Sequence, residues 1–210
     1  MPKACAAGQS RARTRIKRVL TGIKILATAV LGIALGLVAT NAAVNEGVGF
    51  DLVRAGPWTT SAAAGSQNAD PYVKATLARR AEIPLGLAEG LSFVATTDSA
   101  GAALKGRCEY VIQGAIPPAR YWTLSVMTAR GRPIENAAKR YGFTSGEIVR
   151  SEQGAFSIVA SPSARPGNWL PVGKTRSFVL VLRVYDTPVT STASTLDAQS
   201  MPTITQAGCA

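Results

Sequence analysis

The sequence predicts an all-β domain, a sandwich or barrel with one short helix, behind a single N-terminal transmembrane helix. An uncharged apolar run, Ile25–Val44, is long enough to cross a bilayer as a helix. After it, short segments of strand-forming residues alternate with turn signals such as Pro117-Pro118 and Arg130-Gly131. The length of 210 residues suits one domain of ordinary size together with such an anchor.

The N-terminal segment has strongly asymmetric charge. Residues 1–44 carry seven Lys or Arg and no Asp or Glu, and none of the seven lies after Lys24. By the positive-inside rule we expect a basic cytoplasmic arm (1–24), an anchor (25–44) in the inner membrane and a periplasmic domain. The alternative is a cleaved signal peptide, for which Thr40-Asn41-Ala42 is an acceptable cleavage site.

Small residues recur at every fourth position of the anchor, with Gly32 and Gly36 at the centre of the series that runs from Thr28 to Thr40. Such a ridge allows two helices to approach closely, so a homodimer through Gly32 and Gly36 is one hypothesis. The alternative is that glycine is simply common in membrane helices.

The exported part divides by composition into a linker and a domain. Residues 45–69 are rich in Gly, Ala and Ser and predict a linker, and residues 70–210 predict the domain. Asp70 is a suitable N-cap and Pro71 a suitable first helical residue, so we expect a helix over Tyr72–Ala81.

Five segments predict strands, and a sixth is weaker. The five are Leu91–Thr97, Arg107–Gln113, Tyr121–Thr128, Phe156–Ala160 and Phe178–Tyr185, and the weaker one is Glu147–Arg150.

Strand periodicity predicts which side chains face the core. Cys108, Tyr110 and Ile112 share one face of their strand. The strand 178–185 is apolar on both faces, which predicts a central position in a sheet. Arg183 on this strand then needs an acidic partner, for which the candidates are Glu82, Glu89 and Glu109.

Composition excludes several classes of function. The chain has no histidine, so Ser-His-Asp triads and His-based zinc sites are excluded. Its three cysteines form no CxxC pair, and the sequence predicts neither a metal site nor a cofactor. The net charge of +11 falls to +4 over residues 45–210, which argues against nucleic-acid binding.

Cys108 and Cys209 would both lie outside the membrane, where an oxidising compartment favours a disulfide between them. The alternative is two free thiols. The carboxylates of Glu82, Glu89, Asp98 and Glu109 could serve glycan hydrolysis if two of them met in one cleft, although salt-bridge and turn roles are the plainer interpretation.

Mixed aromatic, amide and charged groups near strand ends are the candidate ligand-binding residues. They suit a sugar or small anion, because rings stack and polar groups direct hydrogen bonds. The set is Arg120, Asn168, Trp169, Arg183, Tyr185 and Glu109. The alternative is structural: Trp122 faces the core with Leu124 and Val126, and Asn168-Trp169 fixes a loop rich in proline and glycine.

Three stretches resemble the DUF1214 family, a domain of unknown function, over roughly residues 70–204. They are Asp98–Tyr110, Pro117–Val126 and Asn168–Asp186, with Asn136 and Arg140-Tyr141 between the last two. The resemblance implies a jelly-roll-like β-sandwich of the short, membrane-anchored, stand-alone kind. Met127-Thr128 replaces the family's usual Tyr-Asp, and a late tryptophan before Met201-Pro202 is missing.

These observations predict a membrane-anchored periplasmic module that binds a ligand or partner of the cell envelope, such as a glycan or small molecule, without catalysis. Two alternatives remain: a glycan-active hydrolase or lyase, and a structural envelope protein dimerised through its anchor.

Overall fold

The computed structural model describes residues 5–46, 52–61, 63–80, 82–86, 88–188 and 196–209. The chain divides into two compact units, Met1–Glu46 and Gly47–Ala210.

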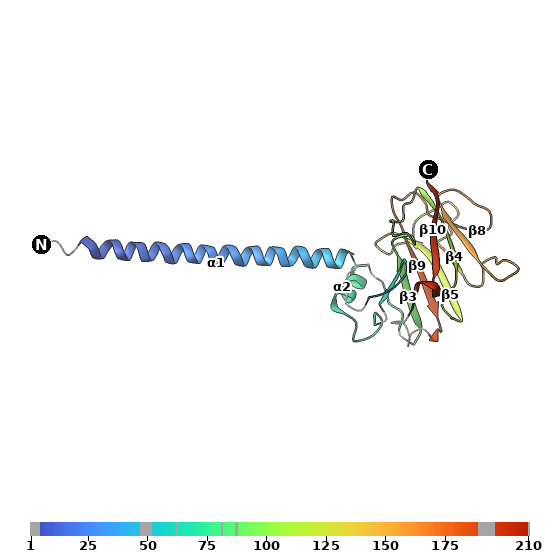
Figure 1. Ribbon diagram of the computed structural model, residues 1–210, viewed down its shortest axis with the longest axis horizontal. Coiled ribbons are helices and arrows are strands. Elements are labelled where there is room, and N and C mark those ends of the chain that lie inside the picture. The colour runs from blue at the N-terminus through green and yellow to red at the C-terminus, as the bar shows by residue number, and fades with distance from the viewer. Residues whose placement is uncertain are drawn as a thin grey trace. The chain divides into compact units, whose positions relative to one another are not determined.

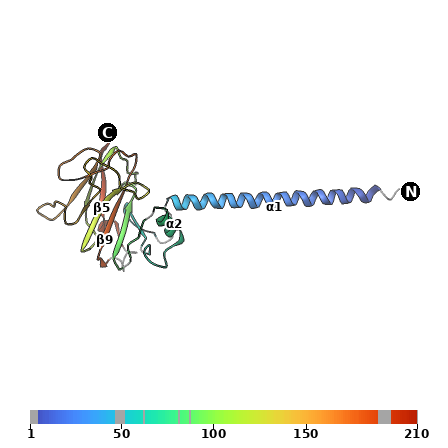
Figure 2. The same cartoon turned by 180° about the vertical axis from the view of Figure 1, so that it is seen from behind.

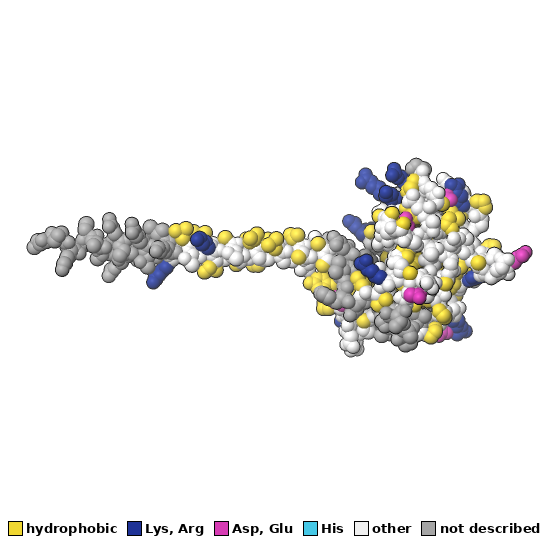
Figure 3. Space-filling view, in the orientation of Figure 1, with side chains coloured by type: hydrophobic (Ala, Val, Ile, Leu, Met, Phe, Trp, Pro, Cys, Tyr) yellow, Lys and Arg dark blue, Asp and Glu magenta, His cyan; other side chains and the backbone are white. Residues whose placement is uncertain are grey.

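The first unit is one long helix, α1 (Cys5–Glu46). Its sequence is rich in Ala, Leu and Ile, and no proline lies between Pro2 and Pro57 to interrupt it. The stretch Arg18–Val44 is long and apolar enough to cross a membrane, with a hydropathy of 2.1. Its apolar side chains are exposed, as at Leu26 with 67% of its surface accessible (Figure 3). This supports, by length and composition, the predicted membrane anchor.

The second unit is mostly β, as predicted, and contains two sheets (Figure 1). In order across the six-stranded sheet lie β1 (Leu52–Ala55), β2 (Trp58–Ser61), β3 (Gly90–Ala95), β9 (Val179–Tyr185), β5 (Tyr121–Met127) and β6 (Gly142–Thr144). Across the four-stranded sheet lie β10 (Pro202–Cys209), β4 (Cys108–Gly114), β7 (Ser157–Ser161) and β8 (Asn168–Pro171).

One hydrophobic core collects side chains from both sheets. Leu182 of β9 and Ile112 of β4 are both fully buried in it. Edge-to-face contact between Tyr110 of β4 and Phe178 next to β9, with ring centroids 5.7 Å apart, joins the two sheets directly. The core therefore fills the space that the inner faces of the sheets share.

The predicted periodicity is confirmed in the central strands. Cys108, Tyr110 and Ile112 are all fully buried on one face of β4. The doubly apolar strand β9 is central, pairing antiparallel with β3 on one side and with β5 on the other (Figure 2). Trp122 is buried in the core, where its ring lies 5.4 Å from that of Phe156.

The predicted linker contains structure that its composition did not suggest. Within residues 45–69, β1 and β2 pair antiparallel, and β2 continues onto β3. Trp58 is fully buried, and its Nε1 donates a 2.7 Å hydrogen bond to the carbonyl of Pro202. This one large aromatic side chain anchors a hairpin whose other residues are mostly small or polar.

Three further strands lie outside the predicted set. β8 occupies Asn168–Pro171, which the proline and glycine content had suggested was loop, and it pairs parallel with β7. β6 is a short edge strand, and β10 has a largely exposed, polar sequence. The weaker prediction of a strand over Glu147–Arg150 is wrong, because only the isolated bridge between Arg150 and Phe156 forms there.

The short helix α2 (Pro71–Arg80) begins as predicted. The Asp70 carboxylate accepts hydrogen bonds from the backbone amides of Tyr72 at 2.7 Å and Val73 at 3.3 Å, which satisfies two free amides of the first turn.

Candidate functional site

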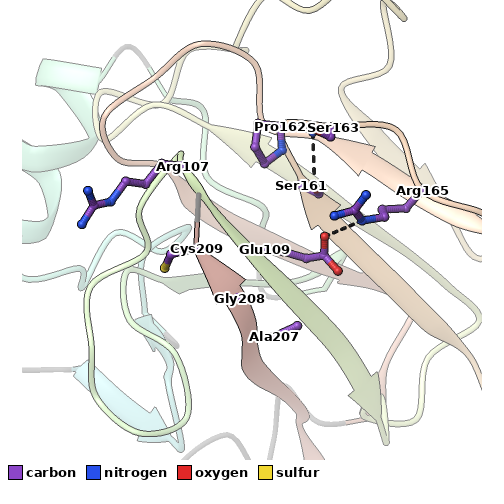
Figure 4. Close-up of a pocket in the computed structure, with 9 residues that line it drawn as sticks. All are labelled: Arg107, Glu109, Ser161, Pro162, Ser163, Arg165, Ala207, Gly208 and Cys209. Carbon is purple, nitrogen blue, oxygen red and sulfur yellow. Dashed lines mark hydrogen bonds and ion pairs between the residues drawn. The ribbon is translucent and has the colours of Figure 1, made fainter.

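A pocket of about 320 Å³ opens where β4 begins and where β7 and β10 end (Figure 4). Its walls come from these three strands and from the loop that leads from β7 to β8. The lining residues are Arg107, Glu109, Ser161, Pro162, Ser163, Arg165, Ala207, Gly208 and Cys209.

An ion pair lies across this pocket. The Arg165 Nε is 2.5 Å from Glu109 Oε2, and 46% and 22% of the two side chains are accessible. Glu109 stands on β4 and Arg165 on the loop after β7, so the register of β4 with β7 brings them together. The backbone amide of Ser163 donates to Ser161 Oγ at 3.2 Å, which fixes the start of that loop.

The predicted disulfide between Cys108 and Cys209 is present at the edge of the pocket. It joins the first residue of β4 to the last residue of β10, which are already paired across the sheet. The pocket thus has one covalently fixed wall, and the Arg107 side chain beside it is exposed.

Asn168, a predicted ligand-binding residue, lies inside the domain and bonds to backbone. Its Oδ1 accepts from the amide of Val149 at 2.8 Å, and its Nδ2 donates to the carbonyls of Val149 at 2.7 Å and Ser157 at 3.0 Å. Only 7% of the residue is exposed. These three bonds attach the segment before β7 to β8, so this side chain has a structural role.

Trp169 is half-buried and also bonds to backbone. Its Nε1 donates to the carbonyl of Ser161 at 3.1 Å, and its own carbonyl accepts from Arg140 Nη1 at 3.0 Å. It therefore fixes β8 to the end of β7 and to the segment just before β6.

The remaining predicted residues lie at another place, around the end of β9. Arg183 Nη2 lies 3.4 Å from Glu82 Oε1, so one of its three predicted partners is confirmed. Arg120 and Asp186 form an exposed pair at 3.6 Å. The Tyr185 ring lies 5.9 Å from that of Tyr121. The predicted residues thus occupy three locations instead of one site.

The four candidate carboxylates are engaged separately. Asp98 is buried in a turn and accepts from the amides of Ala100 and Ala102. Glu89 accepts from the amide of Gly86, while Glu82 and Glu109 pair with different arginines. In the described part of the chain, no group of three or more acidic or cysteine side chains could hold a metal ion.

One tyrosine has a perturbed acidity. The Tyr141 hydroxyl donates a 3.0 Å hydrogen bond to Glu135 Oε2. This bond, followed by burial and the carboxylate charge, raises the pKa of Tyr141 above its ordinary value. The phenol therefore stays protonated to a higher pH than that of an unperturbed tyrosine.

Sequence reasoning found Glu109 but missed Arg107, Ser161 and Arg165 in the pocket. Arg165 follows Glu109 by 56 positions, and no local pattern links them. The only signal that could have found this pair is an unmatched acid on the outward face of β4.

Fold and site together define a two-sheet β domain with a polar pocket, preceded by an apolar helix. Residues 89–189 match the model of a family described as "Protein of unknown function (DUF1214)". The predicted resemblance to the DUF1214 family is confirmed over this segment, which is just under half of the chain.

Two solved structures resemble parts of this chain at low sequence identity. The VPA0106 protein from Vibrio parahaemolyticus has 19% identity and a TM-score of 0.50, over 66% of this chain and 36% of that one. An uncharacterised protein from Burkholderia cenocepacia has 18% identity and a TM-score of 0.36, over 56% and 29%. The chain thus spans about a third of the length of these proteins. The search of curated proteins finds no match.

Proposed function

We propose that this protein is a membrane-anchored binding module of the cell envelope. In this proposal α1 crosses the inner membrane once, and the DUF1214 domain lies in the periplasm. The basic residues on one flank of the apolar stretch support this orientation. The disulfide supports it independently, because disulfides persist in oxidising compartments.

The pocket beside the disulfide is the observation that carries the binding role. It brings together a half-exposed ion pair, Arg107 and two serines, which can direct hydrogen bonds to a polar or anionic ligand. Glu109 faces Arg165 there instead of a second carboxylate, so binding explains the geometry better than glycan hydrolysis, which needs paired acids.

A jelly-roll-like arrangement of the domain belongs to the same proposal. The chain moves from the six-stranded sheet (β3) to the four-stranded one (β4) and back (β5), and it repeats this exchange through β7 and β9. Such crossing between two packed sheets is typical of jelly rolls. The parallel pair β7–β8 departs from the purely antiparallel pattern.

A thermal-shift screen of the full chain in detergent, against glycans, nucleotides and organic acids, tests the binding role. A ligand at a hundredfold excess over its dissociation constant stabilises the native state by about 2.7 kcal/mol. We expect the shift to disappear in Arg165→Ala and to persist in Arg120→Ala, whose ion pair lies at the end of β9. Equal shifts in both variants would remove the pocket from the proposal.

A topology assay tests the location. Fusion of alkaline phosphatase, which is active only in the periplasm, to the chain after residue 209 should give active enzyme. Inactive fusions, with active cytoplasmic reporters at the same position, would overturn the proposed orientation.

A further inference from the structure

Exposed cations gather at one end of the β domain. They come from three loops and are Lys105, Arg107, Arg130, Arg132, Lys174 and Arg176. We call this set the basic end. Figure 3 shows Lys and Arg side chains around the end of the domain at which the chain reaches Cys209.

Strand pairing explains why the three loops meet. Lys105 forms an isolated antiparallel bridge with Ser177, and the amide of Gly106 donates to the carbonyl of Arg176 at 3.0 Å. A Cβ at Gly106 would lie 2.0 Å from the carbonyl oxygen of Thr175, so these two loops touch along their backbones. Pairing of Met127 with Val179 brings the turn containing Arg130 and Arg132 to the same end.

The positive charge of the basic end is uncompensated. The three ion pairs found in the described residues involve none of its members. The neighbouring acids are used elsewhere: Asp98 by the backbone of its own turn, Glu109 by Arg165 and Glu135 by Tyr141. Most of the net positive charge of residues 45–210 therefore lies on this surface.

At the opposite end of the six-stranded sheet, an arginine is paired with an acid, and β1 begins. There, Tyr185 and Gly90 pair, and Asp186 lies next to Arg120. β1 also begins at this opposite end. Trp58, the first residue of β2, pairs with Ala95, so Ser61, the last residue of β2, lies at the other end of that strand, where it pairs with Leu52. Within the domain, the basic end thus lies away from Leu52, the first residue of β1.

We propose that the basic end binds an acidic polysaccharide. Three cationic loops spread over one end of a sandwich suit a flexible polymer with repeated carboxylates better than a small ligand in a cavity. The exposed aromatic Tyr121 lies at the opposite end, so among the described residues the basic end lacks the stacking platform typical of single-strand nucleic-acid sites.

This inference rests on the proposed function for its location and names the ligand class of the module. The test uses the full chain in phosphatidylcholine nanodiscs, with immobilised alginate as the probe. The double variant Lys105→Gln/Lys174→Gln is compared with Arg54→Gln/Lys74→Gln, which removes equal charge from exposed residues of β1 and α2. The basic arm, residues 1–24, is intact in both.

We expect the first variant to bind alginate about tenfold more weakly and the matched control to bind like the wild type. Binding should weaken as salt rises. Hydrogen exchange with alginate present should slow in peptides covering 104–108 and 173–178. Equal affinity of the two variants, or protection confined to the basic arm, would overturn the inference.

Two further probes test the class of ligand. The protein could instead bind oligothymidylate or phosphatidylglycerol vesicles through Lys105 and Lys174 and fail to bind alginate. That result would show that the ligand is not an acidic polysaccharide. A small-molecule thermal shift with no alginate binding would leave the proposed module intact and remove only this inference. A failed topology assay would affect the location and not the binding measurement.

Discussion

At the scale of single residues, the same side-chain chemistry has different consequences inside and outside the core. Asn168 and Asn136 each make three hydrogen bonds to backbone atoms. Asn168 is buried and its bonds join separate segments, whereas Asn136 closes a local turn between Ile134 and Arg140. We therefore expect water to replace the bonds of Asn136 more easily than those of Asn168.

We therefore predict that Asn168→Ala lowers the free energy of unfolding by about 2–3 kcal/mol, because three backbone groups lose their bonds to a buried side chain. The matched variant Asn136→Ala should lose less than about 1 kcal/mol. Urea denaturation followed by tryptophan fluorescence measures both. Similar losses would show that burial of the Asn168 bonds is not what stabilises β8.

The sequence predicts the role of a single residue correctly where that role is only to be buried in the core. Trp122 was expected in the core because it alternates in phase with Leu124, and both are buried. The roles of Asn168 and Glu109 could not be settled in this way. Their partners, Val149 and Arg165, are 19 and 56 positions away and are set by strand register.

At the scale of elements, β10 is held in place more by its pairing and disulfide with β4 than by buried side chains of its own. Only its first residues contribute buried side chains, such as Ile204, and the rest of the strand is exposed. Its far end is fixed to β4 by the disulfide between Cys108 and Cys209. Sequence patterns miss such a strand because its apolar alternation covers too few residues.

Loss of this disulfide should free the end of β10. The bond closes a loop of 101 residues, for which the chain-entropy model gives about 4–5 kcal/mol of stabilisation. We predict that Cys209→Ser loses up to this amount in denaturation experiments and that Cys5→Ser loses none. Wild-type protein under reducing conditions should match Cys209→Ser. If it remains as stable as the oxidised form, the bond contributes nothing to stability.

The elements that sequence predicted and those it missed differ in a physical property. β3, β4, β5, β7 and β9 were predicted because each has enough alternating or continuous apolar residues to fill one inner face. β1 and β2 were missed because small and polar residues surround the single anchoring side chain of Trp58. β8 was missed because it follows a loop rich in proline and glycine and continues to Pro171.

At the scale of the whole molecule, self-association through α1 stays a prediction. Gly32 and Gly36 have open space around them in the isolated helix, since an added Cβ at either would meet no atom within 4 Å. A larger side chain there would not disturb α1 itself. Any effect on association would therefore come from a second helix.

We predict that Gly32→Ile lowers the signal of a transmembrane association reporter. Gly22→Ile is a matched control, because an added Cβ at Gly22 also meets no atom within 4 Å. It should leave the signal unchanged, because Gly22 lies outside the ridge of small residues. Equal signals from the wild type and Gly32→Ile would remove the homodimer prediction.

The contacts of β10 also determine when the domain can fold during synthesis. Pro202 accepts the hydrogen bond of Trp58, and Ile204 exchanges two hydrogen bonds with Ser99, through its amide and its carbonyl. Met201 and Ile204 fill the core itself. We therefore expect the first hairpin and the central strands to complete their packing only after residues 201–209 have left the ribosome. In the proposed topology, export would act on a chain that has not yet closed its core, which suits a translocation channel that passes unfolded polypeptide.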